Sequence, residues 1–264
     1  MGLELGLAKK RVLITASTKG IGYAAAKAFL TNGSRVVVSS SNEENVRAAV
    51  SSLSALGEVY GYKADIRLKE DVEGLVGFAV AKLGGLDVLV YVAGSPPPGV
   101  FMEKTYEDWD EASRLLVLSA TYIAKLTAQQ MISQGSGGSM VFLSSYVIKE
   151  PAPNLALSDV CRISIAGLVR TLARELGPMK IRVNGVMPGY IATQRVEEVL
   201  RDTAKRLNTT PQRALEELQR RIPLGYVGKP EELANVVLFL ASNMSSYVTG
   251  AMIPVDGGIL NSVF

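Results

Sequence analysis

A hydroxyl and a guanidinium stand four residues apart near the start of one predicted helix. The stretch LALSDVCRISIAGLVRTLARELGP, Leu155–Pro178, is amphipathic and carries Ser158 and Arg162. Residues at this spacing share a helix face, one turn apart. The arginine stays charged and binds hydroxyl oxygens but cannot relay a proton, and a serine hydroxyl is a weak acid. The plainer interpretation is a serine near the helix start and a solvated arginine. The rest of the chain has to show whether the two residues form a site instead.

A second pattern able to do chemistry is the turn TASTKGIG, Thr15–Gly22, which follows an apolar run and precedes a helical pattern. At a helix N-terminus the free N–H groups face outward and bind anions, and Gly20 and Gly22 allow close approach of a phosphate. Glycine pairs also occur in turns that bind nothing. The position of this turn after the first strand makes nucleotide binding the favoured interpretation.

The elements that must position these residues alternate along the chain. Helical patterns lie near residues 20–32, 43–56, 68–83, 106–134, 155–176 and 230–241. The strand-like runs are Arg11–Thr15, Arg35–Ser39, Glu58–Lys63, Leu86–Val90, Ser139–Ser144, Ile181–Val186 and Met252–Val255. These runs are nearly all apolar, as expected for parallel strands buried on both faces. The prediction is an α/β fold of Rossmann type: a doubly wound, mainly parallel seven-stranded sheet in a three-layer αβα sandwich.

One segment breaks the alternation. No linker or repeat divides residues 1–264, so a single domain is predicted. After the sixth strand, however, Thr193–Gly228 contains two charged helical patterns, Gln194–Arg206 and Pro211–Arg221. A long insertion at the carboxyl end of a strand is a natural lid over a ligand crevice, so residues 193–228 are predicted to cover the substrate.

The composition excludes several classes of protein. The net charge is only +3, and lysine and arginine form no cluster, which argues against nucleic-acid binding. There is no histidine, which excludes histidine acid–base catalysis and argues against a zinc site, so no metal is predicted. Cys161 is the one cysteine, which fits a cytoplasmic protein without disulfides. No apolar run is long enough to span a membrane, and no signal peptide is apparent.

Several motifs together resemble the short-chain dehydrogenase/reductase family over essentially the whole chain. TASTKGIG is similar to the family's TGxxxGIG fingerprint, with Ala16 in place of its first glycine. VAG, Val92–Gly94, stands where the family has NAG, and VNGVMPGYIAT, Val183–Thr193, resembles the nicotinamide-side segment. The stretches IPLGYVGKPEELANVVLFLAS and YVTGAMIPVDGG resemble the C-terminal part of 3-oxoacyl-carrier-protein reductases.

The resemblance implies a bound dinucleotide that exchanges hydride with a small-molecule carbonyl/alcohol pair. The cofactor contacts that it implies are Thr15, Thr18, Lys19, Gly20, Ile21, Asp65, Ile66, Ala93, Gly94, Arg162, Pro188, Gly189, Ile191 and Thr193. It also points to a homotetramer. The helices predicted at 106–134 and 155–176 are apolar around much of their circumference, as expected for helices that pair across a two-fold axis.

The end of the second strand favours NADP over NAD. NAD-binding sites usually carry an acid there for the ribose diol, whereas this chain has Ser40 followed by Ser41. Lys19 can reach the same corner from the first turn. Hydroxyls and a cation suit a 2′-phosphate, which a carboxylate would repel. The alternative is a merely polar strand end beside a solvated lysine.

The catalytic positions of the family are largely altered. The family pattern has a serine that binds the substrate oxygen and a tyrosine that transfers the proton. A lysine lowers the pKa of that tyrosine and holds the nicotinamide ribose, and an asparagine supports the lysine through water. Ser145 matches the serine, but Ser158 stands at the tyrosine position, Arg162 at the lysine and Leu116 at the asparagine.

Two hypotheses follow. The favoured one is a slow NADP-dependent oxidoreductase (EC 1.1.1 type) in which Ser145, Ser158 and Arg162 form the catalytic site. An ordered water, Tyr146 or Tyr190 would then supply the proton, although Tyr146 should point away from Ser145 and Tyr190 should pack. The alternative is a dinucleotide-binding pseudoenzyme that acts as a sensor or supporting subunit.

Overall fold

The computed structural model describes residues 4–263 and contains one seven-stranded sheet in the order β3-β2-β1-β4-β5-β6-β7. The strands are β1 Arg11–Ile14, β2 Arg35–Ser40, β3 Val59–Lys63, β4 Val88–Tyr91, β5 Gly138–Leu143, β6 Ile181–Pro188 and β7 Met252–Val255. Every neighbouring pair is parallel. The predicted doubly wound sheet is therefore confirmed, and each predicted strand is present with ends shifted by at most two residues.

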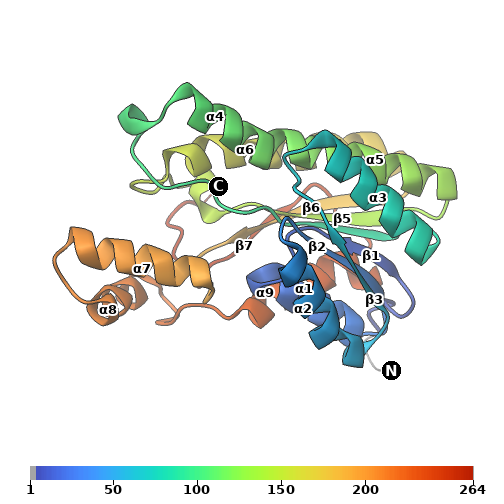
Figure 1. Cartoon of the computed structure of the whole chain (residues 1–264), viewed down its shortest axis with the longest axis horizontal. Coiled ribbons are helices and arrows are strands. Elements are labelled where there is room, and N and C mark those ends of the chain that lie inside the picture. Colours follow the sequence, from blue (N-terminus) through green and yellow to red (C-terminus); the bar gives the residue numbers. More distant parts are fainter. Residues whose placement is uncertain (1–3, 264) are drawn as a thin grey trace.

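Helices cover both faces of the sheet, as Figure 1 shows. Over one face lie α3 Lys69–Leu83, α4 Tyr106–Ser113, α5 Ser119–Gln134 and α6 Ala156–Leu176, and over the other lie α1 Gly20–Thr31, α2 Glu43–Leu53 and α9 Pro230–Ala241. Each face has its own core, because alternate side chains of every strand point to opposite layers. Among the described residues, no helix is both long and apolar enough to cross a bilayer.

The predicted helix at 106–134 is interrupted. A π-helical turn, Arg114–Leu118, separates α4 from α5. The hydroxyls of Tyr91 and Ser119 both donate to the carbonyl oxygen of Leu115, at 3.0 and 2.6 Å. Side-chain donors that bind a helical carbonyl compete with its backbone partner, which is a common cause of such turns. The residue periodicity predicted the helix but not this break.

The segment after β6 forms a separate pair of helices, α7 Gln194–Arg206 and α8 Pro211–Arg221, with the bounds expected from the sequence. Thr210 caps α8 by accepting from the Arg213 amide. Gly228 closes the base of the segment, donating to the Tyr190 carbonyl at 3.0 Å and accepting from the Ala192 amide at 2.7 Å. In Figure 1 the two helices stand beside the sheet rather than against either face.

Candidate active site

The order of the strands creates a crevice at the carboxyl edge of the sheet. The chain winds outward in opposite directions from β1 and β4, which are neighbours. In open α/β sheets, ligands bind at such a switch point, outside the carboxyl ends of the strands. The turn after β1, the end of β2, Gly94 after β4, Ser145 after β5 and Pro188 at the end of β6 all lie at this edge.

The turn between β1 and α1 has a backbone suited to a phosphate. Ala16 and Gly20 both have positive φ, +43° and +54°. A Cβ added at Gly22 would lie 2.5 Å from the Ala16 carbonyl oxygen, so only glycine allows this close turn. No side chain caps the start of α1, which leaves its first N–H groups directed out of the helix. A diphosphate fits such a cradle.

Two hydroxyls of the same turn are used to build it. Thr15 donates to the Val92 carbonyl at 2.6 Å and accepts from the Val92 amide at 2.8 Å, which joins the ends of β1 and β4. Ser17 donates to Ile14 and accepts from the Ser39 amide, which joins the turn to β2. The sequence singled out Thr15 as a cofactor contact. The structure directs its buried hydroxyl to backbone instead, while Thr18 and Ile21 stay half-exposed in the turn.

The corner at the end of β2 carries cations and hydroxyls. Ser40 is half-buried and accepts from the Asn42 amide at 3.3 Å, while Ser41 and Lys19 are exposed. Lys63, which sequence reasoning missed, is the register partner of Ser40 on β3 and is also exposed. Its signal was a charged residue at the end of an otherwise neutral strand.

The segment after β3 holds Asp65 and Ile66. The side chain of Arg67 bonds both carboxylate oxygens of Asp65, with a shortest distance of 2.6 Å. The hydrogen bonds from Arg67 hold the pKa of Asp65 below its usual value, so the carboxylate is charged at neutral pH. Ile66 is buried in the core under this turn.

The nicotinamide-side segment meets the phosphate turn. A Cβ on Gly20 would contact the Thr193 methyl group at 3.2 Å, so the two predicted cofactor motifs lie side by side. Gly189 packs closely on the loop after β7, where a Cβ would meet Asp256 at 2.7 Å. Ile191 is buried in the core beside α1 and α9. Ala93 and Gly94 follow β4, and the Gly94 carbonyl faces Arg162.

The reaction end is built where β5 meets α6. The Arg162 side chain donates to the Gly94 carbonyl at 2.8 Å and more weakly to the Ser144 carbonyl at 3.5 Å. In return, the Ser144 hydroxyl donates to the backbone carbonyl of Arg162 at 3.1 Å. Ser145, the next residue, is half-buried, and its hydroxyl accepts from the Val147 amide at 3.4 Å. Ser158 and Arg162 are both only 7% exposed.

Arg162 carries a buried positive charge that lacks a carboxylate partner among residues 4–263. Burial lowers the pKa of its guanidinium, and Arg195 at the start of α7 acts in the same direction. The nearby acidic groups are the Tyr91 phenol and the Cys161 thiol. Burial raises the pKa of Tyr91 to about 12 and that of Cys161 above its ordinary value, so both are neutral at pH 7.

Leu116 occupies the position of the family's asparagine and makes an apolar contact instead. It packs with Ala112, Leu157 and Cys161 in a small cluster between the π-helical turn and α6. Sequence reasoning missed Tyr91, a phenol buried in the main core, whose hydroxyl lies 2.6 Å from that of Ser119. Its signal was an aromatic residue at the end of the otherwise aliphatic β4.

Two further tyrosines join the edge of the sheet to the lid segment. Tyr146 donates to the Tyr190 hydroxyl at 3.0 Å, and the ring centroids are 5.6 Å apart. Both pack against Leu218, Ile222 and Ile259. Burial, followed by the effect of Tyr190, raises the pKa of Tyr146, so this phenol keeps its proton.

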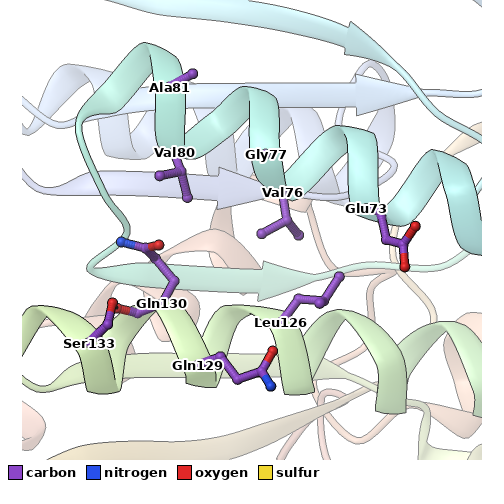
Figure 2. Close-up of a pocket in the computed structure, with 9 residues that line it drawn as sticks. All are labelled: Glu73, Val76, Gly77, Val80, Ala81, Leu126, Gln129, Gln130 and Ser133. Atoms are coloured by element: carbon purple, nitrogen blue, oxygen red, sulfur yellow. The ribbon is translucent and has the colours of Figure 1, made fainter.

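A groove of about 500 Å³ lies elsewhere, between α3 and α5. Figure 2 shows Val76 and Val80 of α3 facing Leu126 of α5 across it, with Glu73 and three polar side chains at its rim. None of the predicted site residues lines it. The groove therefore does not belong to the candidate active site.

Comparison with known proteins identifies related sequences. A family model described as Enoyl-(Acyl carrier protein) reductase matches residues 15–260. The chain is 37% identical over 254 residues to Dehydrogenase/reductase SDR family member 4 of Homo sapiens, covering 96% of this chain and 88% of that protein. It is 34% identical over 252 residues to the 3-oxoacyl-[acyl-carrier-protein] reductase of Thermotoga maritima, covering 95% and 98%.

Solved structures show the same similarity. L-sorbose reductase from Gluconobacter frateurii, complexed with NADPH and L-sorbose, has a TM-score of 0.94 at 28% identity, covering 99% of this chain and 100% of that one. A 7α-hydroxysteroid dehydrogenase complexed with NADH has a TM-score of 0.90 at 31% identity, and both chains are covered completely, at 100%.

Proposed function

Because the chain belongs to the short-chain dehydrogenase/reductase family of dinucleotide-dependent oxidoreductases, we propose that it is an NADP(H)-dependent enzyme with an altered proton donor. Its substrate is a small carbonyl or alcohol compound. The observation that carries the proposal is the phosphate cradle at Gly20 and Gly22 together with the uncapped start of α1. The relatives described above are dehydrogenases or reductases by name, which favours an enzyme over a sensor or supporting subunit.

The bound dinucleotide would supply or accept the hydride. In the proposal, the turn at Thr18–Gly22 would hold the diphosphate, and Asp65 and Ile66 would border the adenine. Ala93 and Gly94 would line the cofactor between its two ends. Pro188, Gly189, Ile191 and Thr193 lie along the nicotinamide. Arg162 would bind the nicotinamide ribose through terminal N–H groups directed at neither Gly94 nor Ser144, and Ser145 would bind the substrate oxygen.

Proton transfer is the weak step of this site. Ser158 has an alcohol where the family pattern has a phenol, and Arg162 cannot give up its proton. The Tyr190 hydroxyl accepts a hydrogen bond from Tyr146, and its own O–H group has no acceptor among the described residues. Tyr190 and ordered water are therefore the two candidate proton donors. General acid catalysis contributes about 10²- to 10⁴-fold, so its impairment predicts slow turnover.

The proposal is tested with the purified chain. NADPH binding is measured by fluorescence titration, and a panel of ketones, aldehydes and diketones is screened by the loss of NADPH absorbance. We expect tight binding and slow oxidation of NADPH with some carbonyl compounds. Binding without turnover across the panel would instead support a sensor or a supporting subunit.

The single cysteine, Cys161, is buried and free, which is consistent with the proposed cytoplasmic location.

NADP(H) should bind more tightly than NAD(H). Lys63 is the register partner of Ser40, and Lys19 is exposed in the turn that Ser17 joins to β2. A charge-assisted phosphate contact contributes about 1.5–3 kcal/mol, which is tenfold or more in affinity. Titration of both cofactors at one salt concentration measures the ratio. Lys19→Ala should reduce it, Ser40→Asp should reverse it, and Lys27→Ala on the exposed side of α1 should leave it unchanged. Equal affinities in the wild type would refute the assignment.

The segment 193–228 should behave as a lid. Its two helices pack on each other and bury Ala204 and Ala214, and a small apolar cluster with Tyr146 and Tyr190 joins them to the sheet edge. With so little buried contact, α7 and α8 should exchange amide hydrogens at least about tenfold faster than β1 and β4. NADP(H) should slow that exchange. Exchange as slow as in the strands, with or without cofactor, would argue against a lid.

The chain should form a tetramer through α4–α6. Leu118, Val160 and Ile163 are 56%, 56% and 55% exposed on the outer side of these helices, where a partner would cover them. Val160→Asp with Ile163→Asp should lower the mass measured by light scattering at micromolar concentration to that of a dimer or monomer. Leu207→Asp, at a residue that is also exposed (64%) but lies in the lid segment, is the control. A monomeric wild type would contradict the prediction.

A further inference from the structure

Ser158 and Arg162 share an unusual combination of burial and unused hydrogen-bonding capacity. Each is only 7% exposed, yet the Ser158 hydroxyl has no hydrogen-bond partner among the described residues. Arg162 has five N–H groups, and those directed at Gly94 and Ser144 account for two of them. Its Nε donates to no described residue.

These unpaired atoms are open to solvent. Among the described residues, the one side-chain nitrogen or oxygen that is both sealed from solvent and unbonded is Thr127 Oγ1. The Ser158 hydroxyl and the Arg162 Nε are unbonded but not sealed, so each keeps some contact with solvent, where a ligand atom can replace water. The two side chains project one helical turn apart from the same face of α6, which brings their donors to the same side of the crevice.

The charge around Arg162 is also unbalanced. A buried guanidinium is costly unless an anion or several acceptors compensate it. Its surroundings contain the neutral phenol of Tyr91, the neutral thiol of Cys161 and a second cation, Arg195. Two carbonyl oxygens, one of them at 3.5 Å, therefore offset the whole charge within the described chain. An anionic group is the ligand that this environment favours.

We propose that Ser158 and Arg162 form a subsite for a carboxylate of the substrate, which makes the substrate an oxo acid or its hydroxy acid. The carboxylate accepts from the Ser158 hydroxyl and from Nε of Arg162, both charge-assisted hydrogen bonds. This inference rests on the proposed reaction, in which Ser145 binds the reacting oxygen. Ser144, the residue before Ser145, contacts Arg162 through backbone and side chain, so the two subsites lie in adjoining parts of the crevice. A carbonyl group next to a carboxylate is the arrangement found in a 2-oxo or 3-oxo acid.

The subsite can be tested without turnover. With NADP⁺ as the bound cofactor an oxo acid cannot be reduced, so calorimetry measures binding alone. Pyruvate should bind about ten- to hundredfold more tightly than its neutral methyl ester. Ser158→Ala should weaken pyruvate binding about three- to tenfold and leave NADP⁺ binding unchanged. Arg162→Gln, measured at saturating NADP⁺, should remove the difference between acid and ester. Arg174→Gln, an exposed arginine on the same helix, should change neither.

Several outcomes would overturn the inference. They are equal affinities for acid and ester, an unchanged affinity in Arg162→Gln, or tighter binding of inorganic phosphate than of pyruvate. NADP⁺ binding is measured in its own titration, so failure of the proposed function appears there as failure to bind NADP⁺. The pyruvate titration is then repeated without cofactor. Pyruvate binding that depends on Ser158 and Arg162 supports the subsite in either titration, and its absence from both refutes it.

Discussion

Restoring the phenol and the amine should accelerate carbonyl reduction about 10²- to 10⁴-fold over the wild type. In the double variant Ser158→Tyr with Arg162→Lys, a phenol would stand one helical turn from an ammonium group that favours its ionised form. The α6 face needs no change of register, because the two positions already have the required spacing. Turnover on a simple diketone, followed by NADPH absorbance, measures the gain.

The surrounding residues provide the controls for that variant. Leu116 is buried against Leu157 and Cys161, where an asparagine would have to support the new lysine, so Leu116→Asn is added as a third change. Arg162→Lys alone should give little gain, because it supplies no acid. The double variant should also lose selective pyruvate binding. If the triple variant binds NADPH but stays inert, other residues limit the reaction and the non-enzymatic alternative gains support.

The fold was largely predictable because the parallel strands are short, apolar and bounded by clear turns. Val36–Val38 and Leu89–Val90, for example, are completely buried, as a sheet covered on both faces requires. The π-helical turn could not be predicted, because it depends on the hydroxyl of Tyr91, far away in the sequence, reaching the carbonyl of Leu115. Helical periodicity contains no information about such a contact.

The site could be predicted as a set of positions but not as a set of contacts. The motif placed Arg162 and Gly94 in one site without indicating that the guanidinium binds the Gly94 carbonyl. Thr15 illustrates the same limit, since a hydroxyl in the fingerprint is directed to the backbone of Val92. The pairing of Tyr146 with Tyr190 needed the loops after β5 and β6 to be placed together in space.

Gly22→Ala should remove most of the affinity for NADP(H), about five- to 150-fold. The added Cβ would lie 2.5 Å from the Ala16 carbonyl oxygen and 2.7 Å from the Ser17 Cα, and backbone atoms cannot rotate away as a side chain can. The turn must therefore open, at a cost of about 1–3 kcal/mol, and the first N–H groups of α1 would lose their alignment. Fluorescence titration of NADPH measures the loss.

Two variants show whether the turn itself is responsible. Gly77→Ala adds a methyl group on α3 with no atom within 4 Å, so it should leave affinity and stability unchanged or raise stability slightly. Ala16→Gly relieves a residue with a φ of +43°, which for an L-residue costs about 1 kcal/mol, and it restores the family's first glycine. It should bind NADPH at least as well as the wild type. Undiminished binding by Gly22→Ala would mean that the diphosphate lies away from this turn, and the proposed cofactor site would have to be abandoned.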